Sequence, residues 1–309
     1  MPSTLHEVAI GVDIGGTKIR AAVIDRDGAL VAGTRHPTDA DRGSAHVLGV
    51  VEASIDELRS GLSPRHDLVG IGLSSAGVIE PETGLVVSSA PNIPGWVGMR
   101  LGEHFTQRYR MPVAADNDAN CALVGEVWRG NHAMDVASSA VMLTLGTGLG
   151  GAMMVAGRLV TGAHHLTGHY GVARIWDRYS EQQVRVEHLV SGTGLGNVYR
   201  QIVPGNRPVG GVEVIERLES GEGDARVALE RWSEHLGLQI HNLHWMIDPD
   251  RIIIGGGMVN SRRHWWPLLE ANLAASGVKV ALVAATLGND AGAFGAARLV
   301  FDRIPVANH

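Results

Sequence analysis

The chain has 309 residues, of which 45% are hydrophobic, and a formal net charge of −6, so it is long enough to form one large globular domain or two ordinary ones. Acidic and basic residues are interspersed, without the basic stripe that follows a phosphate backbone, and nucleic acid is therefore not expected as a partner. The single cysteine, Cys121, excludes an internal disulfide and a zinc site built from several thiolates of one chain.

The sequence contains no signal for export or for membrane insertion. Its first residues lack a basic region followed by an apolar core, and no segment approaches 18 uninterrupted apolar residues. We therefore expect a cytoplasmic protein with no membrane partner.

The N-terminal part of the chain has the pattern of an α/β domain. Residues 8–36 predict a three-stranded meander, because β-branched runs are separated by the turn signals GG and DRDG. An amphipathic helix is predicted over 45–60, where Gly61 and then Pro64 end it, and a buried strand is predicted over 68–79. Strands followed by a helix and a further strand are typical of a mixed-sheet α/β domain.

The remainder of the chain repeats this theme. A strand runs into a helix over 111–130, and 138–160 again predicts strand, glycine turn and strand. Further along, the pattern predicts a helix over 225–247, a strand ending in glycines over 251–258 and a last helix of small residues over 289–304. We expect the two halves to be related folds, with the last helix packed on the N-terminal domain.

Two glycine-rich turns resemble nucleotide-binding motifs, but their contexts differ. DIGGTK (13–18) has P-loop spacing, yet Thr17 precedes Lys18 in the reverse of the required order and a β-strand follows. LGTGLGG (145–151) satisfies GxGxxG, yet a β-like segment stands where a dinucleotide-binding unit has a helix. Such turns can hold phosphates and Mg²⁺ through backbone N–H groups; the alternative is an ordinary hairpin that needs glycine for positive φ. A third glycine cluster over 252–258 favours the binding interpretation.

Five motifs occur in the order, and at roughly the spacing, seen in the ROK family of sugar kinases and related repressors: DIGGTKIRAAVID, APNIPGW, DNDANCALVGE, LGTGLGGA and IIIGGGM. The chain resembles this family over nearly its whole length. The resemblance implies an actin-like, ribonuclease-H-like two-domain α/β fold with mixed sheets, ATP in the interdomain cleft and substrate beneath it. We expect a small domain over 1–115, completed by the C-terminal helix at about 290–309, and a large domain over 116–289.

The resemblance also assigns residues to ATP and to the substrate. It implies that the first two glycine turns meet the ATP phosphates, with Mg²⁺ bound through ATP, and that the third lies near the nucleoside. The implied ATP-binding residues are Asp13, Gly15, Gly16, Thr17, Lys18, Gly146, Thr147, Gly148, Gly256 and Gly257. The implied substrate-binding residues are Ala76, Gly77, Asn92, Asn117, Asp118, Leu166, His169 and Glu187.

Asp118 is the candidate catalytic residue, because it lies where a predicted strand becomes a helix and a carboxylate can project into a cleft. The resemblance implies that Asp118 is the general base for the attacking hydroxyl, while Mg²⁺ and backbone N–H groups neutralise the transferring phosphoryl group. It also implies that Asn117 binds a sugar hydroxyl. The alternative is that Asp118 only caps the helix that follows it.

The segment TGAHHLTGH (161–169) contains three histidines, of which His165 and His169 have the i, i+4 spacing of zinc ligands on a helix. Glycines interrupt the helical pattern and no third ligand lies nearby, so we expect a loop and not a metal site. By motif order, His169 and Glu187 resemble the family's sugar-binding histidine and glutamate, and Leu166 stands where a second glutamate is expected. The zinc loop of several members corresponds to a segment without cysteine, so no structural zinc is expected.

Leu166 bears on the choice of substrate. The resemblance implies that the expected glutamate accepts hydrogen bonds from hydroxyls at the anomeric end of the sugar. An apolar side chain removes these acceptors, and a buried unpaired hydroxyl costs about 1–3 kcal/mol. We therefore expect an ATP-dependent, homodimeric phosphotransferase that acts on the primary hydroxyl of an amino sugar or a C7-cyclitol in preference to glucose. The preference for Arg over Lys fits a secondary-metabolite producer.

Two alternatives to this function stay open. One is an ordinary glucokinase, if a rearranged loop supplies His164, His165 or another group in place of the missing glutamate. The other is a non-catalytic sugar sensor. A sugar-responsive repressor is not expected, because DIGGTK begins at residue 13 and leaves no room for an N-terminal DNA-binding segment.

Overall fold

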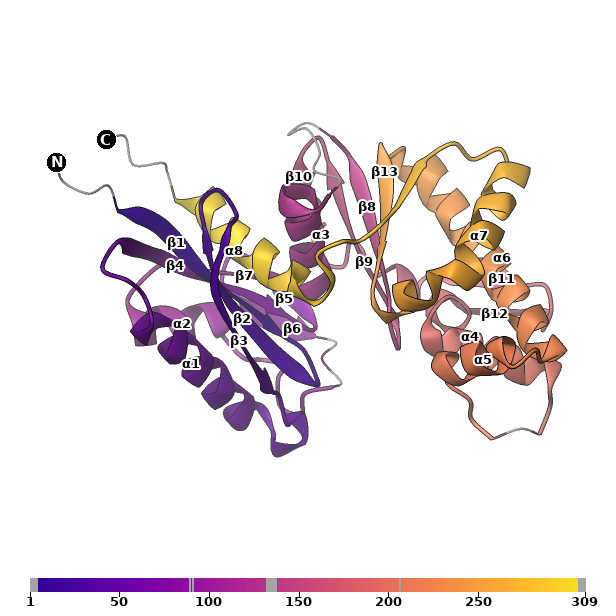
Figure 1. The fold of residues 1–309 in the computed structure, drawn as a ribbon, viewed down its shortest axis with the longest axis horizontal. Helices are drawn as coiled ribbons and strands as arrows, with labels where there is room; N and C mark the ends of the chain where they lie inside the picture. The colour runs from indigo at the N-terminus through magenta and orange to yellow at the C-terminus, as the bar shows by residue number, and fades with distance from the viewer. Residues whose placement is uncertain (1–4, 89, 91, 132–137, 206, 305–309) are drawn as a thin grey trace. The chain divides into compact units, whose positions relative to one another are not determined.

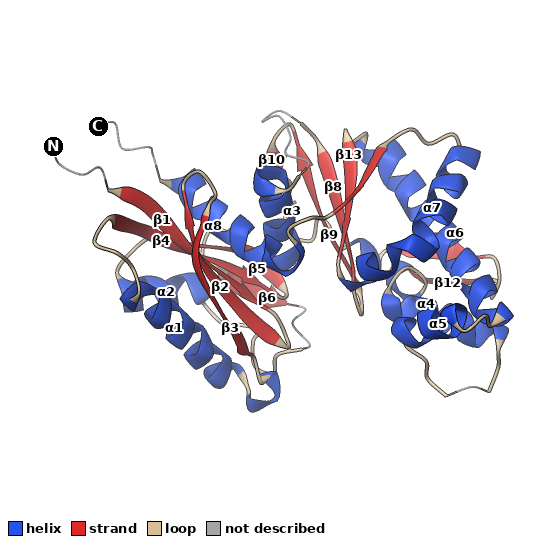
Figure 2. Cartoon of the chain, in the orientation of Figure 1, coloured by secondary structure: helices blue, strands red, loops and turns tan. Residues whose placement is uncertain are grey.

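The computed structural model describes residues 5–88, 90, 92–131, 138–205 and 207–304. Contacts divide the chain into two compact units, residues 1–134, 162–166 and 286–309 and residues 135–161 and 167–285. Each unit contains one mixed five-stranded sheet with helices packed on it (Figures 1 and 2). This confirms the predicted mixed-sheet α/β class.

The first sheet has the strand order β3-β2-β1-β4-β7. Its strands are β1 (His6–Ile14), β2 (Lys18–Asp25), β3 (Leu30–Pro37), β4 (His66–Ser75) and β7 (Val113–Asn117). The first three strands pair antiparallel, which confirms the predicted meander, whereas β1, β4 and β7 run parallel. A small separate hairpin follows β4 and consists of β5 (Val78–Glu80) and β6 (Leu85–Ser88).

Helices cover both faces of the first sheet. They are α1 (Ser44–Ser60), α2 (Leu101–Tyr109), α3 (Asp118–Arg129) and α8 (Ala291–Arg303). Alternate residues of β1 enter different cores, because successive side chains of a strand point to opposite faces. Val8 and Ile10 pack in the core that contains α1 and α2, whereas Ala9 packs with α8. Figure 1 shows α1 and α2 on the opposite side of the sheet from α8.

Helix α8 approaches its neighbours so closely that glycine is required at the contacts. A Cβ at Gly11 of β1 would lie 1.9 Å from the Ala293 carbonyl oxygen, and a Cβ at Gly295 would lie 1.7 Å from the Cys121 carbonyl oxygen of α3. The last helix thus packs directly on β1 and α3 of the first unit. The same contacts group α3 with the first unit, whereas the sequence analysis begins the large domain at residue 116.

The chain returns to the first unit at Thr286, and a buried carboxylate holds it there. Glu126 of α3 is 3% exposed. It accepts hydrogen bonds from the backbone N–H groups of Thr286 at 2.9 Å and Leu287 at 2.7 Å, and from Thr286 Oγ1 at 3.2 Å. Because buried polar groups require hydrogen-bond partners, these bonds fix the segment that leads into α8.

The second sheet has the strand order β10-β9-β8-β13-β14. Its strands are β8 (Ala140–Leu145), β9 (Leu149–Val155), β10 (Arg158–Leu159), β13 (Arg251–Gly255) and β14 (Ala281–Ala284). The strands β8, β9 and β10 pair antiparallel, and β8, β13 and β14 run parallel. Order and directions repeat those of the first sheet, which confirms that the two halves are related folds.

Besides short 3-10 helices, the described part of the second unit contains four further α-helices and a β-hairpin. They are α4 (Gly192–Ile202), α5 (Gly211–Glu219), α6 (Gly223–Ile247), α7 (Arg262–Ala275), β11 (Arg174–Asp177) and β12 (Gln182–Arg185). One apolar core joins these helices to the sheet, with Trp232 of α6 and Trp265 of α7 fully buried in it. Among the described helices, none combines the length and apolar character needed to cross a membrane.

Gly295→Ala should destabilise the protein, because the added Cβ cannot fit against the backbone of α3 and overpacking of this kind costs about 1–3 kcal/mol or more. We expect the melting temperature to fall by several degrees, as measured by circular dichroism. Gly49→Ala is the matched control, since Gly49 is an exposed glycine inside α1 whose Cβ would meet nothing within 4 Å. That change should stabilise the helix by about 0.5–1 kcal/mol. Equal melting temperatures for the two variants would contradict the proposed packing.

Candidate functional site

Parallel pairing brings polar residues to one edge of the first sheet. Asp13 of β1 lies opposite Ser74 of β4, which lies opposite Asp116 of β7. Ser74 Oγ donates to Asp13 Oδ1 at 2.5 Å. The buried Asp116 accepts hydrogen bonds from the Asn117 N–H at 2.7 Å and from Asn120 Nδ2 at 2.8 Å. In open α/β sheets, ligands bind at the carboxyl ends of parallel strands, and this edge is such a place.

Asp13 lies in an environment that disfavours its charged form. Burial raises the pKa of Asp13 to about 6, against the hydrogen bond from Ser74, which lowers it. The charges of Asp118 and Asp290 raise this pKa further, and the charge of Lys18 lowers it. The edge therefore gathers carboxylates that repel one another, and a bound cation would relieve the repulsion.

Asn117, and not Asp118, caps helix α3. Asn117 Oδ1 accepts hydrogen bonds from the N–H groups of Ala119 at 2.9 Å and Asn120 at 3.4 Å. Asp118 is the first residue of the helix, its side chain is exposed, and its Oδ1 accepts from the Ala119 N–H at 2.8 Å. The capping alternative for Asp118 is thus wrong as stated, because the residue before it performs that role. Acidic side chains are favourable in the first turn of a helix.

The segment after β4 reaches the same edge. Asn117 Nδ2 donates to the Gly77 carbonyl oxygen at 2.8 Å, and Gly77 has φ of 103°, a conformation that favours glycine. Ser75, just before Ala76, accepts a hydrogen bond from Trp96 Nε1 at 2.9 Å. The first unit thus brings Gly77, Asn117 and Asp118 together, as the sequence analysis expects for a substrate site.

The β1–β2 turn is held by side-chain and backbone bonds. Gly15 N–H donates to the Lys18 carbonyl oxygen at 3.1 Å, Thr38 Oγ1 donates to the Gly15 carbonyl oxygen at 2.6 Å, and the Thr38 N–H donates to the Thr17 carbonyl oxygen at 3.0 Å. A Cβ at Gly16 would lie 2.9 Å from Asn92 Cβ. Neither Gly15 nor Gly16 has positive φ. The alternative interpretation, an ordinary hairpin that needs glycine for positive φ, is therefore wrong for this turn. At Gly16 the glycine makes room for Asn92.

Three glycine segments meet in the second unit. The β8–β9 turn contains a bond from the Gly146 N–H to the Gly148 carbonyl oxygen at 3.0 Å, and the Gly192 N–H donates to the Gly146 carbonyl oxygen at 2.8 Å. Gly256 has φ of 86°, and a Cβ there would lie 2.4 Å from the Leu145 carbonyl oxygen. The second and third of the glycine turns that the sequence analysis assigns to ATP, which contain Thr147 and Gly257, therefore adjoin each other within the second unit.

The start of α4 belongs to this group, and the sequence analysis does not identify it. Ser191 caps the helix by accepting a hydrogen bond from the Gly194 N–H at 2.9 Å. Gly192 follows and contacts the β8–β9 turn, and the Thr193 N–H donates to the Thr147 carbonyl oxygen at 3.4 Å. Backbone N–H groups at a helix N-terminus favour anions. The signal in the sequence is SGTGLG (191–196), a capping serine followed by glycines.

Glu187 lies beside the β8–β9 turn, since a Cβ at Gly148 would be 3.5 Å from Glu187 Oε2. Its carboxylate also pairs with Arg185 at 3.5 Å. His169 precedes a short 3-10 helix over Tyr170–Val172, and a Cβ at Gly171 of that helix would lie 3.1 Å from Glu187 Cβ. Glu187 thus joins the segment after His169 to the glycine turn, all within the second unit.

The histidine-rich segment is a loop, as expected. Leu166 is 56% exposed, His164 is exposed, and His165 has φ of 57°. The segment 162–166 groups with the first unit. No group of three or more metal-ligating side chains that could hold a metal ion is found within the described part of the chain.

Comparisons with known proteins agree with this arrangement. The model of the ROK family matches residues 9–303. The chain is 29% identical to a glucokinase of Halalkalibacterium halodurans over 94% of each chain, and 31% identical to an N-acetyl-D-glucosamine kinase of Citrobacter koseri over 81% of this chain and 84% of the relative. A ROK family glucokinase from Streptomyces griseus, solved with glucose and AMPPNP, superposes with a TM-score of 0.76 and 26% identity over 96% of this chain and 99% of that one. The expected actin-like fold is thereby confirmed.

Asp13→Asn should stabilise the protein at neutral pH. The folded-state pKa of about 6 lies above the ordinary value of 3.8, so the ionised carboxylate destabilises the folded state, and wild-type stability falls as the pH rises from about 4 to 6. We expect the variant to melt a few degrees higher than wild type at pH 7.5, with a smaller difference at pH 4.5. Asp27→Asn is the control, since it removes an exposed acid from the β2–β3 turn at the opposite end of the strands, and its melting temperature should equal that of wild type at both pH values. A less stable Asp13→Asn protein at pH 7.5 would refute the argument.

Proposed function

Because the chain belongs to the ROK family, we propose that it is an ATP-dependent sugar kinase that phosphorylates the primary hydroxyl of a hexose-like substrate. One observation carries the proposal: Asp118 stands at the carboxyl edge of the first sheet, in the electrostatic field of Asp13, on a helix that Asn117 caps. The glycine turns of the second unit and the N-terminus of α4 supply backbone N–H groups suited to phosphates.

In the proposed reaction, Asp118 accepts the proton of the substrate's primary hydroxyl as its oxygen attacks the γ-phosphorus of ATP, and ADP leaves. Asn117 and Glu187 would bind sugar hydroxyls together with His169. Lys18 would bind phosphate oxygens.

Asp13 would hold Mg²⁺, directly or through water, since it lies among carboxylates whose repulsion a cation relieves. Mg²⁺ usually binds through one or two carboxylates and the phosphates of its substrate, so a protein site of three ligands is not required. The bound ion would neutralise charge on the transferring phosphoryl group.

Asp118→Asn should lower kcat by about 10²–10⁴-fold, the usual contribution of a general base. The melting temperature should stay near that of wild type, because Asn117 continues to cap the helix. Asp224→Asn is the matched control, since Asp224 is an exposed acid in the first turn of α6. A coupled assay of ADP release with a panel of hexoses measures both variants. Turnover close to wild type for Asp118→Asn would contradict the assignment of Asp118 as the general base. No turnover by the wild type would favour the non-catalytic sensor.

The substrate that we propose is an amino sugar or a C7-cyclitol, because Leu166 offers no acceptor at the position of the expected glutamate. The similar N-acetyl-D-glucosamine kinase supports an amino sugar. One observation favours ordinary glucose instead: His165 acts electrostatically on Asp116, next to Asn117 and Asp118, and its buried Nδ1 has no hydrogen-bond partner. That imidazole could replace the missing carboxylate.

Comparison of kcat/KM for glucose, N-acetylglucosamine, glucosamine and a C7-cyclitol decides between the two substrates. We expect glucose to be at least about tenfold poorer than the best of the others, since one unpaired hydroxyl costs about 1–3 kcal/mol. If glucose is preferred, our specificity argument is wrong. His165→Ala should then lower kcat/KM for glucose, whereas His164→Ala serves as the control on the same loop.

We also propose that the enzyme is a homodimer, in which the outer face of α6 is buried. Trp245 and Met246 on this face are 68% and 80% exposed, Leu238 is 42% exposed and Trp176 of β11 is 58% exposed. Large exposed apolar side chains of this kind are typical of subunit interfaces. Trp245→Glu should convert a dimer to a monomer in sedimentation equilibrium, and a monomeric wild type at micromolar concentration would contradict the proposal.

A further inference from the structure

A buried polar network ties the β11–β12 hairpin to the helices of the second unit. Its centre is Asp177, which is 0% exposed. Asp177 Oδ2 accepts hydrogen bonds from Ser180 Oγ at 2.6 Å and from Gln201 Nε2 of α4 at 3.0 Å, and Oδ1 accepts from the Tyr179 N–H at 3.0 Å. His235 Nε2 of α6 lies 3.4 Å from Oδ1. The end of β11 is thus hydrogen-bonded to α4 and lies against α6, two helices outside the hairpin in sequence.

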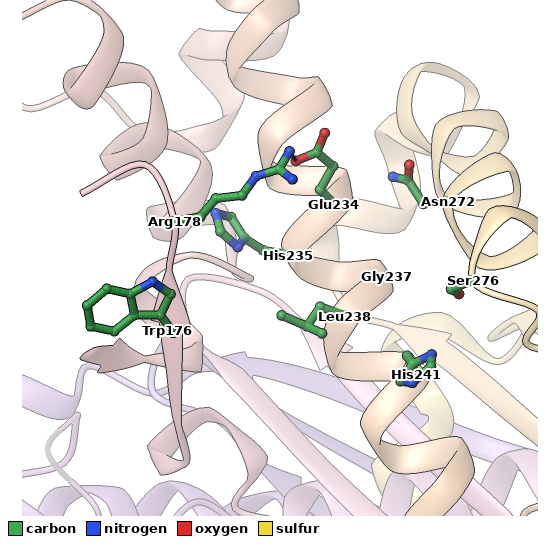
Figure 3. Close-up of a pocket in the computed structure, with 9 residues that line it drawn as sticks. All are labelled: Trp176, Arg178, Glu234, His235, Gly237, Leu238, His241, Asn272 and Ser276. Atoms are coloured by element: carbon green, nitrogen blue, oxygen red, sulfur yellow. Dashed lines mark hydrogen bonds and ion pairs between the residues drawn. The ribbon is translucent and has the colours of Figure 1, made fainter. Parts of the chain in front are cut away.

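An outer layer of contacts covers this centre. Tyr179 Oη and Arg178 each donate to Glu234 Oε2 of α6 at 2.6 Å. The guanidinium groups of Arg178 and Arg231 lie 4.8 and 4.2 Å from the centroid of the Tyr179 ring, distances at which cation–π attraction operates. Figure 3 shows Arg178 and Glu234 pointing toward one another, with His235 close beside Arg178. The hairpin and α6 are therefore joined by a polar cluster that continues outward from Asp177.

The network acts on the segment that carries Glu187. Strand β12 ends at Arg185. The N–H of the next residue, Val186, donates to the carbonyl oxygen of Ala173, which precedes β11, at 2.8 Å. Ser191 Oγ donates to the Glu187 carbonyl oxygen at 2.7 Å. Glu187 therefore sits between the hairpin and the start of α4, and Asp177 joins those same two elements through Gln201.

The protonation states of Asp177 and His235 are consistent with a network that holds the Glu187 segment in place. Burial alone would raise the pKa of Asp177, but the bonds from Ser180, Tyr179 and Gln201, together with His235, lower it below its ordinary value. Burial lowers the pKa of His235. At neutral pH the centre is therefore an ionised carboxylate that accepts three hydrogen bonds beside a neutral imidazole.

A zinc ion does not fit this hairpin. The lone pairs of Asp177 already accept N–H and O–H donors, and the hairpin contains no cysteine. The described residues include no cluster of three or more ligating side chains here or elsewhere. The ion that the resemblance attributes to this segment in several family members thus has no ligand set among the residues that the structure describes.

We propose that Asp177 is a positioning residue, and that its hydrogen-bond network holds the hairpin and Glu187 in place for the sugar without a metal ion. This inference rests on the proposed function for the role of Glu187. It also predicts a property independent of catalysis, because loss of the network should expose the backbone of residues 174–188 whether or not the protein is a kinase.

The decisive variant is Asp177→Asn, which places an amide N–H₂ where donors now point at a carboxylate. We expect the KM for the sugar to rise by about tenfold, the size of effect that follows when a residue that orients a ligand-binding side chain is changed. The KM for ATP should stay within twofold of wild type. Hydrogen exchange of residues 174–188, measured by mass spectrometry, should become faster. Glu181→Gln is the matched control, since it removes an exposed acid from the tip of the same hairpin.

Ser180→Ala keeps the proposal testable if Asp177→Asn fails to fold, because it removes one donor and leaves Gln201 in place. It should raise the KM for the sugar by a few fold and increase the rate of hydrogen exchange of residues 174–188 in proportion. Metal analysis should find no stoichiometric zinc, and 1,10-phenanthroline with excess Mg²⁺ should leave the sugar KM unchanged.

Unchanged exchange in both variants, or faster exchange with an unchanged sugar KM, would overturn the positioning role, and stoichiometric zinc would overturn its metal independence. If the wild type phosphorylates no sugar, the proposed function fails by itself, and the exchange data still decide whether the network orders the hairpin.

Discussion

Parallel pairing of β1, β4 and β7 is the constraint on which the candidate site depends. It sets Asp13, Ser74 and Asp116 in one row at the carboxyl edge of the sheet. A shift of one residue in this register would turn the polar side chains toward the opposite face. Asn117 and Asp118 follow directly, so the same pairing that builds the core places the proposed base.

That arrangement is unfavourable for the isolated fold and useful for a kinase. Burial, together with the smaller effect of the charges of Asp118 and Asp290, raises the pKa of Asp13, and such perturbed groups cluster at functional sites because catalysis requires charge that folding alone would avoid. The stability needed to hold them comes from elsewhere in the first unit. Helix α8 packs backbone against backbone through Gly11 and Gly295, and Glu126 fixes the segment that leads into it.

The second unit repeats the sheet of the first and uses it differently. Its equivalent turn, at Gly146, is bonded to the start of α4, so glycine serves close backbone approach as well as tight turning. Around Asp177, hydrogen bonds and aromatic contacts occupy the place where the family resemblance suggests a metal. A buried carboxylate that accepts three hydrogen bonds, as Asp177 does, favours a single conformation of the segments that it joins, which is the property that a substrate-binding segment requires.

The sequence by itself determined the fold class and the elements with the strongest periodicity. Hydrophobic periodicity located the meander, the helix α1 and the two related sheets, because period and turn residues are local properties. Motif order identified the family and the residues proposed for its site. It also indicated that Asp118 marks a strand-to-helix junction.

Tertiary structure decided which of those residues lie together and what supports them. No sequence motif marks Ser74 or Asp116 as a site residue, since their importance comes from strand register. The structure also showed that Asn117 caps helix α3, whereas the sequence analysis considered Asp118 as the possible cap. The grouping of α3 with α8, the contact of α4 with the glycine turn and the network around Asp177 all join residues far apart in the chain. Such contacts depend on backbone distances between elements, which no local pattern of side chains encodes.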